Sequence, residues 1–321
     1  SGDINDIQNL LPPLISQASY VYTNFTCASM RCMFLGKRDE LYTKVQETLM
    51  KANVRPLQPL INDLRLTKSK AEIENMLIAG QSSGLAFTNA MRKKWTKEKD
   101  LRSFLEYEFK LNGCDTTAYV PVVAGGKNAL CIHYVRNDDI LSNGQMVLTD
   151  AGGEYGGYIT DITRTWPIDG KFTEAQKDLY NAVLQAQRKC ISLCREDANL
   201  SLDELHGIAE SSLKENLRQI GFHMTSNAIS SLFPHHVGHY IGLDVHDCAG
   251  YPRSKKLKAG YCVTIEPGVY VPNDERWPKN FRGMGIRIED SVCVQDDTPI
   301  NLTSKAVKEV VDIESLRNSV I

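Results

Sequence analysis

The sequence predicts an α+β protein whose main domain consists of two similar halves that face each other across a central site. From residue 68 onward, two helices are followed by strands, and the same order then occurs a second time. A glycine, a valine three residues later and an acid three residues after that occur once in each half, at Gly144–Asp150 and at Gly260–Glu266. Each half then supplies a second acid on a later strand, Asp161 or Glu289. Self-similarity of this kind indicates an internal duplication.

The composition is that of an ordinary globular protein. The 321 residues are 42% hydrophobic and 24% charged, with a net charge of −2. This balance gives no electrostatic case for binding nucleic acid or an anionic membrane. No apolar run approaches the ~20 residues that a membrane span needs. The nine cysteines are scattered without a C-x-x-C pair, which favours reduced thiols inside a cell.

Two domains are expected, with a boundary between residues 66 and 67. Residues 1–66 are too few for a confident independent core, so we expect them to be the end of an N-terminal domain whose beginning is missing. Residues 67–321 would form the main domain. The elements expected in the first part are a short helix around residues 10–15 interrupted by Pro12 and Pro13, strand-like runs at 21–22 and 32–35, and a helix over 41–52.

Four helices are predicted in the main domain from their start and stop signals. A capping box, in which Ser or Thr is followed three residues later by Glu or Gln, opens the first, third and fourth helices. Thr96 is expected to cap the second helix. Gly113 and Gly221 are expected to end the second and fourth helices. The capping boxes are Ser69-x-x-Glu72, Thr173-x-x-Gln176 and Ser201-x-x-Glu204.

The strands of the first half are predicted to be Ala118–Val123, Cys131–Val135 and Met146–Asp150, followed by the stretch Asp150–Trp166. That stretch has glycines that suit a turn, flanked by Tyr, Ile and Thr residues that suit strands. It therefore predicts two strands with a glycine-rich connection and an acid on each. Residues 222–300 are expected to be strand and loop, and a last strand and tail begin at Pro299.

The four acids of the two halves are the first candidate site. A strand acid that faces a core is costly unless it is paired or bound to a metal. The alternative is that Asp150 and Asp161 are solvated acids at a hairpin, and these two residues alone do not decide between the readings. If the halves face each other, Asp150, Asp161, Glu266 and Glu289 come together, and four carboxylates can bind Mg²⁺, Ca²⁺ or Mn²⁺.

A cluster of histidines changes the expected chemistry. Four of the seven histidines fall within residues 235–247, namely His235, His236, His239 and His246. One imidazole with several carboxylates suits Mn²⁺, Co²⁺ or Zn²⁺. Two ions that share carboxylate ligands activate water as a nucleophile toward a carbonyl or phosphoryl group. The histidines therefore favour a dinuclear hydrolytic site, with His236 expected to be incidental.

These motifs together resemble those of the pita-bread metallopeptidases, and within that family the aminopeptidase P and prolidase branch. The resemblance covers roughly residues 66–310. It implies a pita-bread fold, in which two pseudo-symmetric helix–helix–strand halves surround a curved antiparallel sheet. The matching blocks are Asp150-Ala-Gly, Thr160-Asp161-Ile-Thr-Arg-Thr, His235-x-x-x-His239, Val245-His246-Asp247, Thr264-Ile-Glu266-Pro-Gly-Val-Tyr270 and Gly285-Ile-Arg287-Ile-Glu289-Asp290.

The resemblance implies two divalent metal ions, with Mn²⁺ expected and Co²⁺ or Zn²⁺ as alternatives. Asp150 would chelate one ion. Asp161 and Glu289 would bridge both ions. His239 and Glu266 would complete the ligands of the second ion. All five positions match the family pattern in residue type.

The resemblance also implies roles for residues around these ligands. Glu266 would pass a proton to the leaving amine. His246 or His133 would stabilise the oxyanion that develops on the substrate carbonyl, and His235 would shape substrate binding. Residues expected to support the ligands from outside are Arg287, Tyr270 and Thr163.

The implied activity is that of an aminopeptidase that removes one residue from the N-terminus of a peptide or protein. The match to mitochondrial aminopeptidase P-like members, among them the fungal intermediate-cleaving peptidases, implies that imported precursors are trimmed in mitochondria after presequence removal. No targeting segment is visible, and a homodimer is left open. The alternatives are an Xaa-Pro aminopeptidase that requires proline in the second position, a prolidase, and a metal-free protein-binding module. Residue spacing does not separate the substrates.

Overall fold

The structure is a computed structural model that describes residues 3, 6–24, 47–225 and 227–318. The chain divides into two compact units, Ser1–Leu64 and Arg65–Ile321. Among the described residues, no helix combines the length and the apolar character that crossing a membrane requires. Each unit is described by itself below.

The first unit contains α1 (Ile7–Gln17), and β1 (Val21–Thr23) pairs in parallel with β2 (Val54–Pro56). Helix α1 continues through Pro12 and Pro13, so the predicted interruption is wrong. Proline holds φ near the helical value, and the cost of the missing amide donors does not break this helix. The predicted strand 32–35 lies outside the described residues, and of the predicted helix 41–52 only residues 47–50 are described as helical. Helix α4 (Gln58–Leu66) leads into the second unit.

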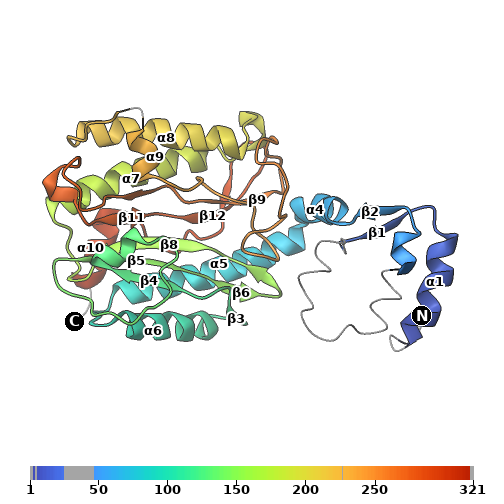
Figure 1. The fold of residues 1–321 in the computed structure, drawn as a ribbon. Helices are drawn as coiled ribbons and strands as arrows, with labels where there is room; N and C mark the ends of the chain where they lie inside the picture. Colours follow the sequence, from blue (N-terminus) through green and yellow to red (C-terminus); the bar gives the residue numbers. More distant parts are fainter. Residues whose placement is uncertain (1–2, 4–5, 25–46, 226, 319–321) are drawn as a thin grey trace. The chain divides into compact units, whose positions relative to one another are not determined.

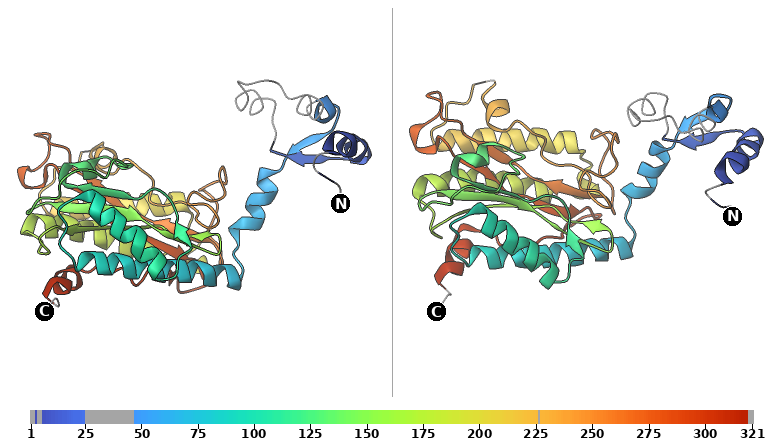
Figure 2. Two further views of the ribbon diagram at one scale, coloured as in Figure 1. Left: turned by 90° about the horizontal axis from the view of Figure 1, so that it is seen from below. Right: turned by 60° about the horizontal axis from the view of Figure 1, so that its bottom comes forward.

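The second unit is a mixed layer structure in which helices lie on two sides of antiparallel strands. Figure 1 shows α5 and α6 along one side of the strands and α7 and α8 along the other, and Figure 2 shows α5 and α6 running across their face. The order of two helices followed by strands therefore occurs twice. The helices are α5 (Lys70–Met91), α6 (Glu98–Leu111), α7 (Glu174–Ser192) and α8 (Leu202–Gln219).

The helix signals are confirmed at most ends. Ser69, Thr173 and Ser201 each form a complete capping box, with both reciprocal hydrogen bonds present. Gly113 and Gly221 follow their helices with positive φ angles of 111° and 96°. The predicted Thr96 cap is wrong, because α6 begins after Lys97 without a side-chain cap. Acidic residues in its first turn complement the positive helix end instead.

Of the four acids, Asp150 lies within a strand, and Asp161, Glu266 and Glu289 directly precede or follow strands, of two three-stranded antiparallel sheets. The first has the order β4-β5-β8 and pairs Asp150 with Thr163; the second has the order β13-β12-β9 and pairs Ile265 with Asp290. Their strands are β4 (Val122–Gly125), β5 (Met146–Ala151), β8 (Ile162–Pro167), β9 (Cys262–Ile265), β12 (Asp290–Cys293) and β13 (Ile300–Asn301). Shorter strands are β3 (Thr116–Thr117), β6 (Gly153–Tyr155), β7 (Tyr158–Ile159), β10 (Gly268–Tyr270) and β11 (Gly285–Arg287).

Several strand predictions are wrong. The predicted strand Cys131–Val135 is not a strand; a 3₁₀ turn, η2 (Gly126–Leu130), precedes a non-strand segment there. High β-propensity in a segment does not ensure that a second strand lies beside it, because strand pairing depends on residues distant in sequence. The predicted strand 118–123 begins only at Val122. Residues 222–300 also contain α9 (Ala228–Leu232) and a 3₁₀ turn, η4 (Lys279–Phe281).

The C-terminal segment is a strand followed by a helix rather than a strand and a tail. Helix α10 (Val310–Asn318) buries Val310, Ile313 and Leu316. These residues recur every three positions, which places them on one face of a helix. The strand and tail were predicted from the valines alone, which do not show the three-residue spacing of a buried helix face.

Helix α5 approaches the segment after β13 at two glycines. A Cβ on Gly80 would lie 2.4 Å from the Leu302 carbonyl oxygen, and one on Gly84 would lie 2.7 Å from the Ala306 nitrogen. Because these neighbours are backbone atoms, they cannot move aside cheaply. The absence of a side chain at both positions therefore sets the distance between α5 and residues 302–306.

We expect Gly80→Ala to lower the free energy of unfolding by about 1–3 kcal/mol, the usual cost of overpacking. Gly207→Ala in α8 is the matched control, because no atom of the described residues lies within 4 Å of a Cβ at that position. It should stabilise the protein by about 0.5–1 kcal/mol through helix propensity. Urea denaturation measures both, and equal effects of the two substitutions would contradict the close approach.

Candidate metal centre

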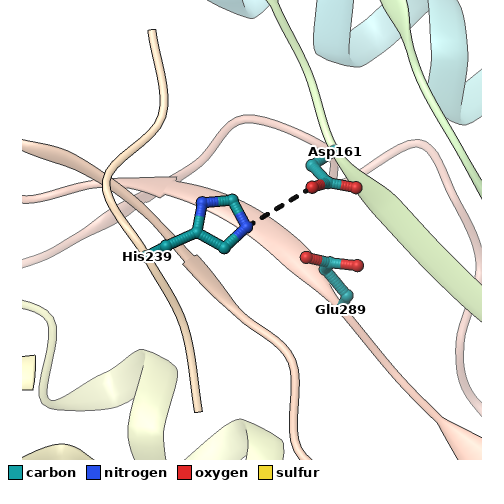
Figure 3. A group of neighbouring side chains, drawn as sticks. All are labelled: Asp161, His239 and Glu289. Atoms are coloured by element: carbon teal, nitrogen blue, oxygen red, sulfur yellow. Dashed lines mark ion pairs between the residues drawn. The ribbon is translucent and has the colours of Figure 1, made fainter. Parts of the chain in front are cut away.

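Three predicted ligands meet at the junction between the two halves. One potential ligand atom each from Asp161, His239 and Glu289 lies within 4.8 Å of the others. Asp161 directly precedes β8, Glu289 directly precedes β12 and His239 lies in an irregular segment, and Figure 3 shows that all three point into one space. Asp161 and Glu289 are almost completely buried, and His239 is half-buried.

The position of His239 follows from its pairing with β9. The Thr264 amide donates to the His239 carbonyl at 2.9 Å, and the His239 amide donates to the Thr264 hydroxyl at 3.1 Å. The His239 Nδ1 lies 3.0 Å from the Tyr240 carbonyl oxygen. A carbonyl only accepts hydrogen bonds, so Nδ1 carries a hydrogen and the lone pair of the neutral ring is on Nε2. That atom faces Asp161 Oδ2 at 3.6 Å and Glu266 Oε1 at 3.5 Å.

Asp150 and Glu266, the other two predicted ligands, border this group. Asp150 lies on β5, and its Oδ1 accepts a 2.6 Å hydrogen bond from the hydroxyl of Tyr119, which also bonds Asp161. Glu266 follows β9 directly and contacts His239. The structure therefore brings all five residues into one connected group of side chains.

The three residues expected to support the ligands also lie together. The buried Arg287 guanidinium donates to the Thr163 hydroxyl at 3.0 Å, to the Tyr270 hydroxyl at 2.8 Å and to Asp150 Oδ2. The Thr163 hydroxyl in turn donates to Glu289 Oε2 at 2.5 Å. Arg287 thus connects a carboxylate of the first half to one of the second, and fixes the orientation of both.

The group holds less positive charge than its buried carboxylates need. Burial raises the pKa of Asp150 to about 6 and that of Glu266 to about 7, and burial with the charges of nearby acids raises the pKa of Glu289 well above its ordinary value. Burial opposes charge on Asp161 and His239 as well, but their mutual hydrogen bond outweighs it. The pKa of Asp161 is lowered as a result, and that of His239 is raised to about 9. Without a cation, these carboxylates do not all ionise at neutral pH.

The residues fit divalent metal ions. Glu289 Oε1 is buried and has no hydrogen-bond partner among the described residues. An unpartnered carboxylate oxygen is costly in a protein interior, and a cation would satisfy it. A set of carboxylate oxygens with one imidazole nitrogen suits Mn²⁺, Co²⁺ or Zn²⁺.

The other predicted histidines lie in a cleft that opens onto this group. The cleft has a volume of about 680 Å³. The His246 ring stands edge-on to that of His239, with centroids 4.5 Å apart. Residues lining the cleft include His133, His235, His239, His246 and Glu266. A molecule in this cleft would therefore contact imidazoles beside the carboxylates.

His235 is held as a neutral hydrogen-bonding residue. Its Nδ1 lies 2.9 Å from the His236 carbonyl and donates to it, which leaves Nε2 to accept from the Tyr270 hydroxyl at 2.9 Å. Burial and the charge of Arg287 lower the pKa of His235 to about 3. His235 can therefore orient Tyr270 and a bound molecule, but its ring stays uncharged at neutral pH, with a single proton on Nδ1.

Two residues beside the site, Tyr119 and Asp247, were given no role in the sequence analysis. Tyr119 lies just before β4, and β4 pairs with β5 beside Asp150. Tyr119 belongs to no motif, so its sequence signal was its position next to that strand. Asp247 is buried and forms ion pairs with Arg65 and, at 3.2 Å, with Lys68. Its amide also donates to the Tyr240 carbonyl, so it anchors the loop that carries His246. Its position next to His246 was the available signal.

Comparison with known proteins places this architecture in a family. Residues 74–296 match the family described as metallopeptidase family M24. That match covers more than half of the chain, and the chain belongs to metallopeptidase family M24.

Particular members of the family are similar over nearly the whole chain. Intermediate cleaving peptidase 55 of Saccharomyces cerevisiae is 42% identical over 98% of this chain and 63% of its own length. Human Xaa-Pro aminopeptidase 3 is 39% identical over 98% of this chain and 63% of its own length. The crystal structure of Icp55 from Saccharomyces cerevisiae bound to apstatin inhibitor matches with a TM-score of 0.89 and 42% identity, over 99% of this chain and 76% of that chain. The chain spans less than two thirds of the length of these two curated relatives.

We expect Mn²⁺ to stabilise the protein more at pH 7.5 than at pH 5.5. The raised pKa values of Asp150, Glu266 and His239 mean that the ion must displace protons at low pH, and fewer as the pH rises. Each displaced proton makes affinity change by about tenfold per pH unit. Thermal unfolding with and without Mn²⁺ at both pH values measures this. A larger Mn²⁺-induced rise in Tm at pH 5.5 would contradict the protonation states described here.

We expect Glu289→Gln to remove the stabilisation by Mn²⁺ while changing the metal-free protein little. At a concentration 100 times its Kd, an ion adds about 2.7 kcal/mol to the free energy of unfolding. Gln keeps the shape of the side chain. Because the pKa of Glu289 is strongly raised without a cation, a neutral amide changes the charge of the metal-free protein little. Glu215→Gln, at an exposed position of α8, is the control and should respond to Mn²⁺ as the parent does. An unchanged Mn²⁺ response in Glu289→Gln would exclude Glu289 as a ligand.

Proposed function

We propose that this protein is a metal-dependent aminopeptidase that removes a single residue from the N-terminus of a peptide or protein. The observation that carries the proposal is the connected group of four acids and one histidine at the end of a histidine-lined cleft, in which one Glu289 oxygen has no partner among the residues that the structure describes. Membership of metallopeptidase family M24 supports the reaction class. A metal-free binding module is disfavoured because it would bury several carboxyl groups, with raised pKa values, at a cost in stability that no cation offsets.

We propose Asp150 as the chelator of one ion, Asp161 and Glu289 as bridges, and His239 with Glu266 as ligands of the second. When bound, two divalent ions would supply an activated water molecule and polarise the scissile carbonyl. We expect Mn²⁺, with Co²⁺ or Zn²⁺ as alternatives. His239 Nε2 lies 3.6 Å from Asp161 Oδ2 and 3.5 Å from Glu266 Oε1, and the Glu289 carboxylate points into the same space (Figure 3).

The protein's own residues then handle protons and orientation. Glu266 lines the cleft and contacts His239, so its carboxylate is placed to accept a proton from the attacking water and to pass it to the leaving amine. His246 and His133 line the cleft and can donate to the oxygen of the scissile carbonyl as charge develops there. Arg287 holds Tyr270 and Asp150 in place, and Tyr270 in turn is fixed by His235.

We further propose that the substrates are imported mitochondrial precursors from which one residue is trimmed after presequence removal. The name of the yeast relative, intermediate cleaving peptidase, supports this reading. The human relative supports the alternative of an Xaa-Pro aminopeptidase, which requires proline in the second position. The prediction of a mitochondrial location has the same basis as the precursor reading, and imaging of the tagged protein in its host cell tests it.

The proposed architecture is the pita-bread fold, with residues 67–321 as the catalytic domain and residues 1–66 as part of an N-terminal domain. The repeated order of two helices and strands supports two pseudo-symmetric halves around a curved antiparallel sheet. Light scattering of the purified protein measures its mass in solution and so distinguishes a homodimer from a monomer.

We expect the purified protein with Mn²⁺ to release one residue from peptides that begin with Tyr, Leu or Phe, whatever residue follows. The cleft, and not a proline-specific contact, would then set the cleavage position. A panel that varies the first two residues, read by mass spectrometry, measures this, and apstatin, the inhibitor bound to the yeast relative, tests whether the same cleft is used. Strict dependence on proline in the second position would establish the alternative.

The matched loss-of-function variants are Asp161→Ala and Glu289→Ala. Each should lower activity by at least about 100-fold, because changes even to residues outside the ligand shell cost about 10–100-fold. Full activity in both variants, or a purified protein that takes up no Mn²⁺ and cleaves no peptide, would contradict the proposed function.

A further inference from the structure

The two sheets meet along a seam formed by residues 161–165 of one half and residues 287–291 of the other. The strands β8 and β12 belong to separate sheets. One direct backbone hydrogen bond crosses the seam, from the Glu289 amide to the Thr163 carbonyl at 3.0 Å. On either side of that bond, side-chain hydroxyls take the place of backbone pairing.

The first of these hydroxyls belongs to Ser291, which is fully buried. Its Oγ accepts from the Asp161 amide at 3.1 Å and donates to the Asp161 carbonyl at 2.9 Å. A single hydroxyl thus satisfies both backbone polar groups of a proposed bridging ligand. Since the backbone of Asp161 is fixed by Ser291, the direction of its carboxylate depends on a residue of the opposite half.

The second hydroxyl belongs to Thr165 of the first half and bonds the backbone of the second half, whereas Ser291 of the second half bonds the backbone of the first. Its Oγ1 donates to the Arg287 carbonyl at 3.0 Å and accepts from the Arg287 amide at 3.3 Å. Arg287 is the residue whose guanidinium bonds Asp150, Thr163 and Tyr270. Thr165 therefore fixes the backbone from which that guanidinium extends.

A buried arginine, Arg164, forms hydrogen bonds to both sides of the seam on the face opposite to the carboxylates. Arg164 is fully buried, and its Nη1 donates to the Thr163 carbonyl at 2.9 Å and to the Glu289 carbonyl. Its Nη2 donates to Asp290 Oδ1 at 2.6 Å. Successive residues of a strand point to opposite faces, so Arg164 and Asp290 lie behind the seam while Thr163 and Glu289 face the site.

We propose that Ser291 and Thr165 are positioning residues that set the separation of Asp161 and Glu289, and so the affinity of the site for its ions. This inference rests on the proposed function, because the spacing across the seam would serve the proposed metal site. A hydroxyl bridge holds two strands further apart than direct backbone pairing does. The bridging carboxylates, which come from the two edges of the seam, then have room for ions between them.

The test uses the purified full chain and variants that remove one hydroxyl each. Ser291→Ala and Thr165→Val delete the bridging oxygens, whereas Thr165→Ser keeps the oxygen and loses only a methyl group. Thr149→Val is the matched control. Thr149 is a fully buried threonine of β5 whose hydroxyl has no partner among the described residues, so the substitution removes no bond.

Titration calorimetry with Mn²⁺ should show a Kd raised about 10–100-fold in Ser291→Ala and Thr165→Val, the usual effect of changing residues that hold ligands. Thr165→Ser and Thr149→Val should stay within about threefold of the parent. Where Mn²⁺-dependent cleavage is measured, kcat at saturating Mn²⁺ should fall with KM little changed, because the seam does not line the cleft. Parent-like Mn²⁺ affinity in both hydroxyl-deleted variants would overturn the proposal.

Hydrogen exchange separates positioning from general destabilisation and does not depend on the metal. In metal-free Ser291→Ala, the peptide that contains Asp161 should exchange faster than in the parent, while peptides of α7 and α8 exchange at the parent rate. Uniformly faster exchange, or no change at Asp161, would overturn the positioning role. A parent protein that binds no Mn²⁺ would sink the proposed function instead, and the exchange result would still decide whether Ser291 positions Asp161.

Discussion

The structure depends on one electrostatic constraint: several carboxylates are buried together with too little positive charge among them. Asp150, Glu266 and Glu289 have raised pKa values, and one buried oxygen of Glu289 has no hydrogen-bond partner within the described part of the chain. Such an arrangement costs stability unless a cation completes it. A protein that keeps the cluster must hold its members rigidly, so that the ion and not a structural rearrangement relieves the repulsion.

The surrounding architecture provides that rigidity from both halves. Arg287 joins Asp150 to the Thr163–Glu289 pair, and the segment of His239 is bonded along β9. Ser291 reaches across the seam to the backbone of Asp161. Asp150, Asp161 and Glu289 are thus each held by a residue of the opposite half, so both halves contribute to building one site.

Local features were predictable from the sequence, whereas pairings between distant residues were not. The three capping boxes are formed because their bonds join residues three positions apart. The five proposed ligands were found by motif, and the structure brings them together. Tyr119 and Ser291 were missed because their importance lies in which strand is opposite. The strand predicted at Cys131–Val135 is wrong for the same reason, since β-propensity names no partner.

The most direct test of the central claim is anomalous scattering from a crystal of this protein grown with Mn²⁺. The account predicts two Mn²⁺ peaks among Asp150, Asp161, His239, Glu266 and Glu289, about 3.5–4 Å apart, with Asp161 and Glu289 in contact with both. A fully loaded crystal with no peak in this group, or with Mn²⁺ bound elsewhere and the carboxylates unchanged, would contradict it.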